Sequence, residues 1–183
     1  MSLKRLPGEL TEQEELSSMI RVNHAGEYGA KRIYEGQLAA LKGSSCVPTI
    51  KHMKDQEQVH LDYFSNELVN RRIRPTLLSP LWHAGGFLLG YATGFLGEKV
   101  AMACTVAVED VIDQHYEEQE ERLKTFKAPE QDLKNKIAQF RAEELEHKET
   151  GLHHGAEDTP GYKLLTTGIK NITKLAIFLS KRL

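Results

Sequence analysis

The sequence contains little cysteine and no large excess of charge of either sign. Its two cysteines, Cys46 and Cys104, lie far apart and form no Cys-x-x-Cys motif, so the sequence indicates neither a disulfide framework nor a thiolate metal site. The 24 Lys and Arg residues nearly balance the 26 Asp and Glu residues, which leaves a formal net charge of −2. The chain therefore lacks the positive field that drives binding to a phosphate backbone. We expect a protein of a reducing compartment that does not bind nucleic acid.

Long apolar runs are also scarce, and the one exception spans residues 75–97. This segment contains no Asp, Glu, Lys or Arg and is long enough to cross a bilayer. Glycines and prolines interrupt it, however, which makes its insertion as a spanning helix weak. We therefore expect this segment to lie in a membrane interface and not to cross it.

Segments that alternate apolar and polar residues are nearly absent, whereas long segments rich in Glu, Gln, Lys, Leu and Ala predict an all-α chain. The sequence from Thr11 to Glu14 matches a capping box, so a first helix should start there and end near Gly43. A second helix should follow, with Pro48 in its first turn, and stop before Arg74.

Three further helical segments are expected in the rest of the chain. One starts at Ser79, is either broken or long because glycines loosen its first half, and is firmly helical from Glu98 onward. Another opens at Pro129. Residues 160–183 are basic and amphipathic, so this last helix either closes a bundle or lies on a membrane. We expect residues 1–183 to form a single domain, an antiparallel four-helix bundle with additional amphipathic helices.

Six acidic and imidazole side chains lie on helix faces that ought to be apolar and buried. Two glutamates stand alone on the first and third helices, and a Glu-x-x-His pair lies on each of the second and fourth. The six residues are Glu27, Glu57, His60, Glu109, Glu144 and His147. An i, i+3 spacing aims two side chains at one point, so each pair can offer an oxygen and a nitrogen to the same ion.

The charge of these four carboxylates needs compensation inside the fold. The inward faces contain no Lys or Arg to pair with them, and burying isolated carboxylates would cost many kcal/mol. Two divalent cations would neutralise them, and oxygen plus imidazole ligation suits iron, manganese or zinc. Single Glu-x-x-His pairs arise by chance and usually form surface salt bridges. The conjunction of two pairs and two lone glutamates on four helices favours a dinuclear metal site.

Most other polar residues of these helices are expected to face solvent: His24, His52, Glu143, Glu146, Glu149, His153 and His154. His115 and Tyr116 are different, because they follow Glu109 by one or two helical turns and lie within reach of a ligand. They are either a relay for protons or electrons or a satisfied core pair. Cys104 is expected to be a small core residue.

Four motifs resemble those of the demethoxyubiquinone hydroxylases, di-iron monooxygenases of ubiquinone biosynthesis. They are RVNHAGEYGA at residues 21–30, the Glu57 and His60 pair, AVED at 107–110 followed by His115 and Tyr116, and ELEH at 144–147 followed by Gly151 and Leu152. The resemblance covers nearly the whole chain. It implies a ferritin-like bundle with two irons, in which Glu57 and Glu144 bridge the metals and Glu27 and Glu109 are terminal ligands.

The resemblance also implies hydroxylation of the ring of a polyprenylated demethoxyubiquinone, with O2 as oxidant and NADH as the ultimate electron source. The sequence has no Gly-rich dinucleotide loop, so electrons should come from a partner or from NADH that docks transiently. The partners implied are a lipid quinone, the membrane surface, and a homo-oligomer or a complex of ubiquinone biosynthesis.

A substrate with an isoprenoid tail requires access from a membrane. Residues 75–97 are expected to supply an apolar mouth, unless they form an ordinary helix-packing seam, and the basic helix within 160–183 should attract anionic lipid. The first residues show neither a secretory signal nor an Arg-rich presequence. We therefore expect a peripheral protein on the cytoplasmic face of a bacterial inner membrane, with the matrix face of the mitochondrial inner membrane as the alternative.

Two other functions remain compatible with the residues alone. A ferritin-like protein for iron storage or detoxification would share the ligands, although a cage-forming subunit has no obvious need for the apolar segment 75–97. A helical scaffold on a membrane surface would keep the glutamates and histidines solvated and bind no metal.

Overall fold

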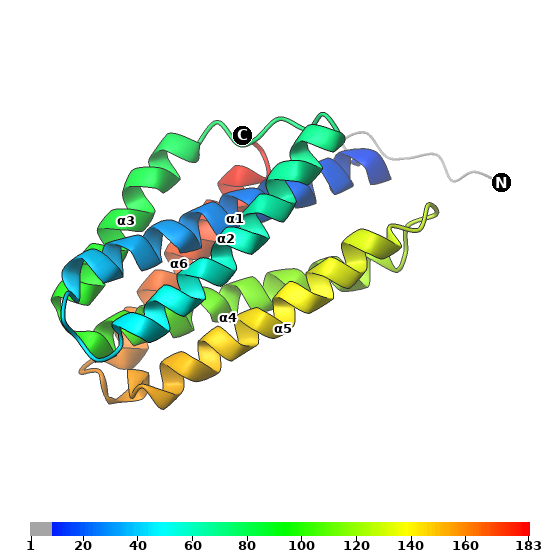
Figure 1. The fold of residues 1–183 in the computed structure, drawn as a ribbon. Helices are drawn as coiled ribbons and strands as arrows, with labels where there is room; N and C mark the ends of the chain where they lie inside the picture. The colour runs from blue at the N-terminus through cyan, green and yellow to red at the C-terminus, as the bar shows by residue number, and fades with distance from the viewer. Residues whose placement is uncertain (1–8) are drawn as a thin grey trace.

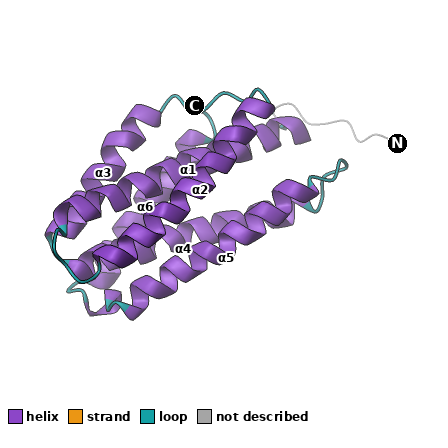
Figure 2. Cartoon of the chain, in the orientation of Figure 1, coloured by secondary structure: helices purple, strands orange, loops and turns teal. Residues whose placement is uncertain are grey.

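Six α-helices account for most of residues 9–183, the part of the chain that the computed structural model describes (Figure 1). The helices are α1 (Glu12–Ala40), α2 (Val47–Asn70), α3 (Ser79–Phe95), α4 (Glu98–Leu123), α5 (Gln131–His153) and α6 (Tyr162–Ser180). A short 3-10 helix, η1 (Ala156–Asp158), precedes α6. No strand occurs in this range (Figure 2), so the predicted all-α class is confirmed.

The long helices are arranged as two antiparallel hairpins. α1 packs against α2, α4 packs against α5, and the two hairpins together form a four-helix bundle (Figure 1). α3 packs along α1, and α6 packs against α4 and α1. The two additional helices therefore cover the side of the bundle formed by α1 and α4.

Local sequence signals mark the start of α1 and the first turn of α2. At the start of α1 the backbone N–H of Glu14 donates to Thr11 Oγ1 at 3.0 Å, and the backbone N–H of Thr11 donates to Glu14 Oε2 at 2.7 Å, which confirms the capping box. α1 ends at Ala40, slightly before the expected end near Gly43. α2 carries Pro48 in its first turn and ends before Arg74, as predicted.

The expected third helix is broken into two at Gly97. This residue has a φ of +117° and separates α3 from α4. Side chains with a Cβ rarely adopt such a φ, so the glycine permits the reversal. The break directs α4 back through the bundle and leaves α3 outside it.

Glycines allow α1 and α3 to approach more closely than other residues would. A Cβ on Gly90 would lie 1.9 Å from the carbonyl oxygen of Ile33, and a Cβ on Gly36 would lie 2.2 Å from that of Phe87. Such backbone contact between helices requires small residues at the crossing. Much of the glycine content of residues 75–97 therefore serves helix packing.

The inward faces of the bundle helices agree with the predicted ones. In α2 the buried residues are Ile50, Met53, Glu57, His60, Leu61, Phe64 and Leu68, and in α5 they are Leu133, Ile137, Phe140, Glu144, His147 and Gly151. Cys104 is fully buried in the core, as expected. Between residues 9 and 183 no lysine or arginine is buried.

α6 buries part of its apolar face and exposes another part. Ile169 is buried, but Ile172 is 59% exposed. Ile172 lines a cavity between α6 and its neighbours.

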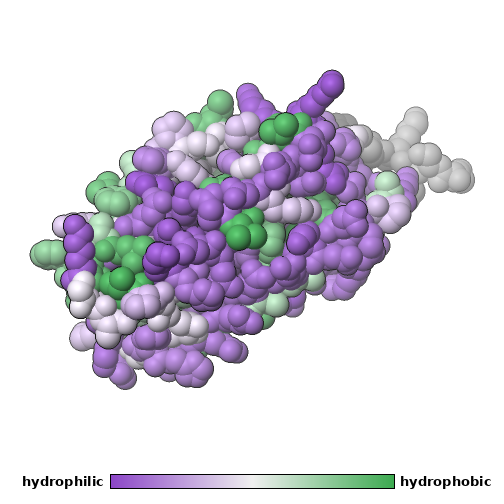
Figure 3. All heavy atoms as spheres, in the orientation of Figure 1, coloured by the Kyte–Doolittle hydropathy of each residue, from purple (hydrophilic) through white to green (hydrophobic). Residues whose placement is uncertain are grey.

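Apolar side chains remain exposed on the two outer helices. They are Leu81, Leu88, Tyr91, Phe95 and Leu96 on and just after α3, and Leu164, Ile172, Leu175 and Phe178 on α6. In Figure 3 the visible face is mostly hydrophilic, and apolar atoms gather at the end where α3 leads into α4. Among the described residues, no helix combines the length and apolar character needed to span a bilayer.

Candidate metal centre

The six residues predicted as ligands lie together in the middle of the bundle. They form two overlapping groups of four, within each of which one potential ligand atom per residue lies within 4.8 Å of the others. The groups are Glu27, Glu57, His60 and Glu144, and Glu57, Glu109, Glu144 and His147. All six side chains are at most 3% exposed. Glu57 and Glu144 belong to both groups, and the remaining four residues belong to one group each.

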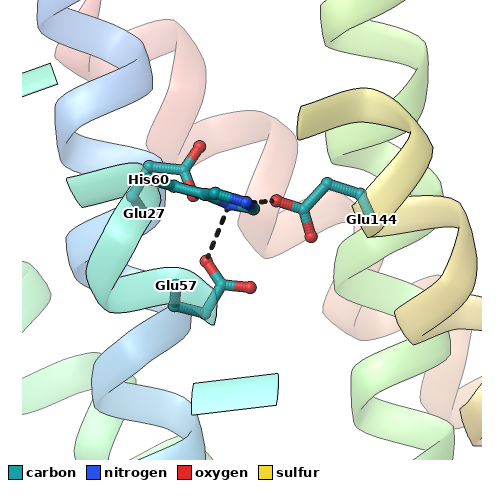
Figure 4. Close-up of side chains that lie close together, drawn as sticks. All are labelled: Glu27, Glu57, His60 and Glu144. Carbon is teal, nitrogen blue, oxygen red and sulfur yellow. Dashed lines mark hydrogen bonds and ion pairs between the residues drawn. The ribbon is translucent and has the colours of Figure 1, made fainter. Parts of the chain in front are cut away.

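The first group is centred on Nδ1 of His60 (Figure 4). This nitrogen lies 3.2 Å from Glu27 Oε2, 3.2 Å from Glu144 Oε1 and 4.0 Å from Glu57 Oε2. The carboxylates come from α1, α5 and α2, so the group joins three helices of the bundle.

The second group is centred on Nδ1 of His147. This nitrogen lies 3.1 Å from Glu144 Oε2 and 3.3 Å from Glu57 Oε1. Glu144 and Glu57 thus each direct one oxygen to His60 and the other oxygen to His147. Two carboxylates that face both imidazoles have the arrangement expected of bridging ligands.

The outer nitrogen of each imidazole has an acceptor of its own. Nε2 of His60 lies 2.7 Å from Glu143 Oε2, and Nε2 of His147 lies 3.0 Å from Gln56 Oε1. An acceptor at Nε2 holds a proton there, so a cation that displaces the Nδ1 proton would meet the lone pair of Nδ1. Both imidazoles are therefore oriented to bind a cation through Nδ1.

The expectation that Glu143 faces solvent is wrong. Its side chain is only 25% exposed and accepts the hydrogen bond from His60 across the helix interface. Because Glu143 directly precedes a ligand in sequence, it lies beside the inward face of its own helix. Its side chain is nevertheless long enough to reach the neighbouring helix. Gln56 occupies the same place in α2, immediately before Glu57, and sequence reasoning missed it as well.

The carboxylates of the centre have strongly shifted proton affinities. Burial, followed by the charge of Glu144, raises the pKa of Glu57 well above its usual value and that of Glu109 to about 8. Burial would also raise the pKa of Glu144, but hydrogen bonds from His147 and His60 outweigh it and lower that pKa to about 2. The two histidines therefore compensate only part of the negative charge.

Several carboxylate oxygens have no hydrogen-bond partner within the described residues. Both oxygens of Glu57 and Oε2 of Glu109 are buried and accept no hydrogen bond, although Glu57 Oε1 lies 3.3 Å from Nδ1 of His147. An unpaired buried acceptor costs about 1–3 kcal/mol, and more when it is charged. Glu57 belongs to both groups and Glu109 to the group of His147, so hard oxygen donors and two imidazoles gather in two overlapping sets. This donor set fits two divalent cations.

Two tyrosines hold the carboxylates at the ends of the centre. Tyr34 Oη donates to Glu109 Oε1 at 2.7 Å, and Tyr116 Oη donates to Glu27 Oε1. Sequence reasoning singled out Tyr116 but not Tyr34. A signal existed, because each tyrosine follows a lone glutamate by seven residues and so lies on the same helix face.

His115 does not lie against the six residues as Tyr116 does. Its Nε2 accepts a hydrogen bond from Gln119 Nε2 at 2.7 Å, and Gln119 also exchanges hydrogen bonds with Asn23. Burial lowers the pKa of His115 to about 3. The ring is thus a neutral acceptor in a buried polar network between α1 and α4.

The other polar residues mostly lie where the sequence placed them. His52, Glu146, Glu149, His153 and His154 are exposed, as expected. His24 is an exception, because it is only partly exposed and its Nδ1 is buried without a hydrogen-bond partner. The prediction of an exposed His24 is therefore wrong, and burial lowers the pKa of its imidazole.

An apolar cavity of about 270 Å³ lies beside the centre, between α1, α3, α4 and α6. Its walls include Gly26 and Gly29 of α1, Trp82 of α3, Val108 of α4 and Ala176 of α6. Gly26 and Val108 directly precede Glu27 and Glu109, so the cavity runs past the helix turns that carry these two carboxylates.

Comparison with known proteins gives consistent matches over almost the whole chain. A family model described as ubiquinone biosynthesis protein COQ7 matches residues 14–180. A 3-demethoxyubiquinol 3-hydroxylase of Rhodospirillum rubrum is 49% identical over 179 residues, which cover 97% of this chain and 83% of that protein. A mitochondrial NADPH-dependent 3-demethoxyubiquinone 3-hydroxylase of Homo sapiens is 50% identical over 167 residues, covering 90% and 76%. A mitochondrial 5-demethoxyubiquinone hydroxylase of Saccharomyces cerevisiae is 41% identical over 182 residues, covering 92% and 78%.

Proposed function

The chain belongs to the family of the ubiquinone biosynthesis protein COQ7, and we propose that it hydroxylates the ring of a polyprenylated demethoxyubiquinone at a di-iron centre. It is an enzyme of ubiquinone biosynthesis that catalyses the hydroxylation step. Family membership separates this function from iron storage and from a metal-free scaffold, the two alternatives that the residues alone left open. The observation that carries the proposal is the cluster of buried carboxylates and imidazoles, with no lysine or arginine buried among residues 9–183.

Each residue of the centre has a distinct role in holding the metals. Glu57 and Glu144 would be shared by the two iron positions, since each directs one oxygen to His60 and the other to His147. Glu27 and His60 would complete one position, and Glu109 and His147 the other. When bound, the iron pair supplies the binding and reduction of O2, chemistry that no side chain of this centre provides by itself.

The surrounding residues orient these ligands and keep the site dry. Tyr34 and Tyr116 fix the terminal carboxylates, and Glu143 and Gln56 fix the imidazoles. All of the ligand side chains are shielded from solvent, which strengthens their interaction with a cation. Tyr116 is also a candidate for moving a proton to or from Glu27, whereas His115 would act only through Gln119.

The apolar cavity is the proposed binding site for the quinone. Its position beside Glu27 and Glu109 brings an aromatic ring toward the centre, and its boundary with α3 and α6 leads outward. The exposed apolar residues of these two helices, together with basic residues such as Lys174, support attachment to a membrane surface, from which a tail would enter. We propose a peripheral protein of a bacterial inner membrane on its cytoplasmic face, with the mitochondrial matrix face as the alternative.

The electron source is a nicotinamide nucleotide in this proposal. The family resemblance implied NADH, whereas the names of several relatives, including that of Homo sapiens, specify NADPH. Either nucleotide would deliver electrons by transient docking or through a partner, because no Gly-rich dinucleotide loop is present in the sequence. A homo-oligomer or a complex of ubiquinone biosynthesis would provide such a partner.

Reconstitution tests the proposed function. The protein is loaded anaerobically with Fe²⁺ and then given O2, a short-chain demethoxyquinone, and NADH or NADPH in separate reactions. We expect about two irons per chain and a hydroxylated ring by mass spectrometry. Protein with two bound irons that forms no product, either with a nucleotide or after chemical reduction of its irons, would contradict the assignment.

Two variants control this experiment. Glu144→Ala removes a carboxylate shared by both metal groups, so both iron and product should be lost. Glu149→Ala changes an exposed carboxylate on the same helix and should leave both unchanged. Equal loss in the two variants would mean that the inward face of α5 has been assigned incorrectly.

A further inference from the structure

The two Glu-x-x-His pairs are connected by crossed hydrogen bonds. Glu143, immediately before Glu144 in α5, accepts the Nε2 proton of His60 in α2. Gln56, immediately before Glu57 in α2, accepts the Nε2 proton of His147 in α5. The residue that precedes each shared glutamate therefore holds the histidine of the opposite pair.

The two halves of the centre contain the same types of ligand, but the acceptors of their histidines differ in charge. Each half has one terminal glutamate held by a tyrosine from the opposite helix, and both share Glu57 and Glu144. The acceptor on His60 is a carboxylate, and that on His147 is a neutral amide. Glu143 is further fixed by Gln139, whose Nε2 donates to Glu143 Oε1 at 2.9 Å.

This difference changes the donor strength of the two histidines. A carboxylate that accepts the outer N–H proton draws that proton away and makes the inner nitrogen a stronger ligand, whereas an amide does so less. Replacing such an outer partner commonly changes metal affinity by about 10–100-fold.

We infer that the two metal positions are unequal, and that the position at His60 binds a divalent cation more tightly than the position at His147. Glu143 and Gln56 are the positioning residues that set this order. The inference rests on the two-metal centre of the proposed function. It adds an order of loading and the residues that control it.

A metal titration of the full chain tests the inference without measuring catalysis. Protein stripped by a chelator is titrated with Co²⁺ without oxygen, and binding is followed by calorimetry and by the visible absorption of the bound ion. The unchanged chain should bind two Co²⁺ in steps whose affinities differ by about tenfold or more.

The two acceptors can be exchanged one at a time. Glu143→Gln should weaken the tighter step by about tenfold, so that the two steps merge, and should leave the weaker step unchanged. Gln56→Glu should strengthen the weaker step by a similar factor. The second variant guards against misfolding as an explanation, because a damaged fold does not bind metal more tightly. Glu146→Gln, an exposed residue of α5, is the matched control and should change neither step.

A double exchange identifies which position fills first. In the natural background Glu27→Ala should weaken the first step, because Glu27 belongs to the His60 group. When Gln56→Glu and Glu143→Gln are combined, the order should reverse, and Glu109→Ala should then weaken the first step.

The outcomes separate this inference from the proposed function. Two equal steps in the unchanged chain, or affinities that neither Glu143→Gln nor Gln56→Glu alters, would overturn the inference and leave the two-metal centre intact. A parallel loss of both steps in Glu143→Gln without any gain in Gln56→Glu would assign Glu143 a purely structural role and overturn it too. If the unchanged chain binds no Co²⁺, both the inference and the proposed centre fail.

Discussion

Single hydroxyl groups hold the ends of the metal centre in place. Tyr34 from α1 holds Glu109 of α4, and Tyr116 from α4 holds Glu27 of α1, so each helix fixes the carboxylate of the other. Both tyrosines are about 1% exposed, and water is therefore not available to replace their hydrogen bonds. The position of each terminal carboxylate thus depends on one phenol.

Removal of one such phenol is the first prediction. Tyr34→Phe leaves Glu109 Oε1 buried without a donor, which should lower the free energy of unfolding of the metal-free chain by about 1–3 kcal/mol. It should also weaken Co²⁺ binding by about tenfold, because the carboxylate is no longer held. Thermal unfolding and metal titration measure the two effects. Tyr91→Phe, at a 43% exposed residue of α3, is the control and should show neither.

The buried imidazole of His115 gives the second prediction, a dependence of stability on pH. Burial lowers its pKa to about 3, whereas an unfolded histidine titrates near pH 6.5. Between these values the unfolded chain binds a proton that the folded chain does not, so stability falls as the pH falls. From pH 7 to pH 5 this group should cost about 2 kcal/mol.

Comparison with a variant isolates this contribution of His115. In His115→Asn the loss of stability between pH 7 and pH 5 should be smaller by about that amount, as measured by urea unfolding of both proteins in the same metal state. An identical pH dependence in the two proteins would mean that the ring is protonated in the folded chain.

The residues of the site were predictable to different degrees for physical reasons. The six ligands lie on helix faces whose periodicity the sequence reveals, so Glu57 and His60 can be found without a structure. The partners Glu143 and Tyr34 depend on how two helices are aligned along their axes. That alignment results from packing of the whole bundle, so it cannot be predicted from the spacing of residues within one helix.

At the scale of secondary structure, the contact between α1 and α3 depends on glycines. The third prediction is that Gly90→Ala separates these helices, because its Cβ would lie 1.9 Å from the carbonyl oxygen of Ile33. Overpacking of this kind typically costs about 1–3 kcal/mol, and rigid backbone leaves little room for relief. Thermal unfolding of the variant measures the cost. An unchanged melting temperature would show that the helices separate easily.

Gly29 offers the opposite case and the fourth prediction. A Cβ at this position meets nothing within 4 Å, and the residue lines the apolar cavity. Gly29→Leu should therefore keep or slightly raise stability, since leucine favours a helix over glycine by up to about 1 kcal/mol. Its side chain should occupy the cavity and lower kcat/KM for the quinone by about tenfold or more.

Metal content distinguishes blockage of the cavity from damage to the centre. Iron binding in Gly29→Leu should equal that of the unchanged chain, because the new side chain points into the cavity. Full activity in this variant would mean that the quinone ring enters by another route.

The sequence predicted which segments are helical better than it predicted how they connect. The capping box at Thr11 and the prolines near α2 are local signals, and the helix ends they mark were found. The break at Gly97 was left open, since a glycine permits a reversal without requiring it. The exposure of Ile172 depends on the cavity, which arises only when α3 and α6 are both in place.

For the molecule as a whole, α3 and α6 present most of the exposed large apolar residues. The fifth prediction is that these residues bind lipid. A double substitution, Phe95→Ser with Leu96→Ser, removes two side chains that are 75% and 68% exposed and should reduce sedimentation with anionic vesicles several-fold. Val59→Ser and Val69→Ser, at exposed apolar positions of α2 on the other side of the bundle, are the controls. Equal binding by both double variants would place the lipid contact elsewhere.

The overall class of the fold followed from composition and periodicity, and the bundle of four long helices with two outer ones is as expected. The placement of α6 was not predictable, because a basic amphipathic helix suits either a bundle or a membrane. In the structure α6 packs on α4 and α1 and still exposes Leu175 and Phe178. It therefore covers the bundle and also presents an apolar surface of the kind that suits a membrane. That residues 1–183 form one domain stays a prediction.

The crossed arrangement makes the two hairpins mutually incomplete. α1 and α2 contain His60 but not its acceptor Glu143, and they contain Glu27 but not Tyr116. The hairpin of α4 and α5 contains Glu143 and Tyr116 but lacks His60 and Glu27. If the chain were cut at the Gly97 reversal, neither fragment would carry a finished site, and iron would act as the template that selects correct reassembly of the two pieces.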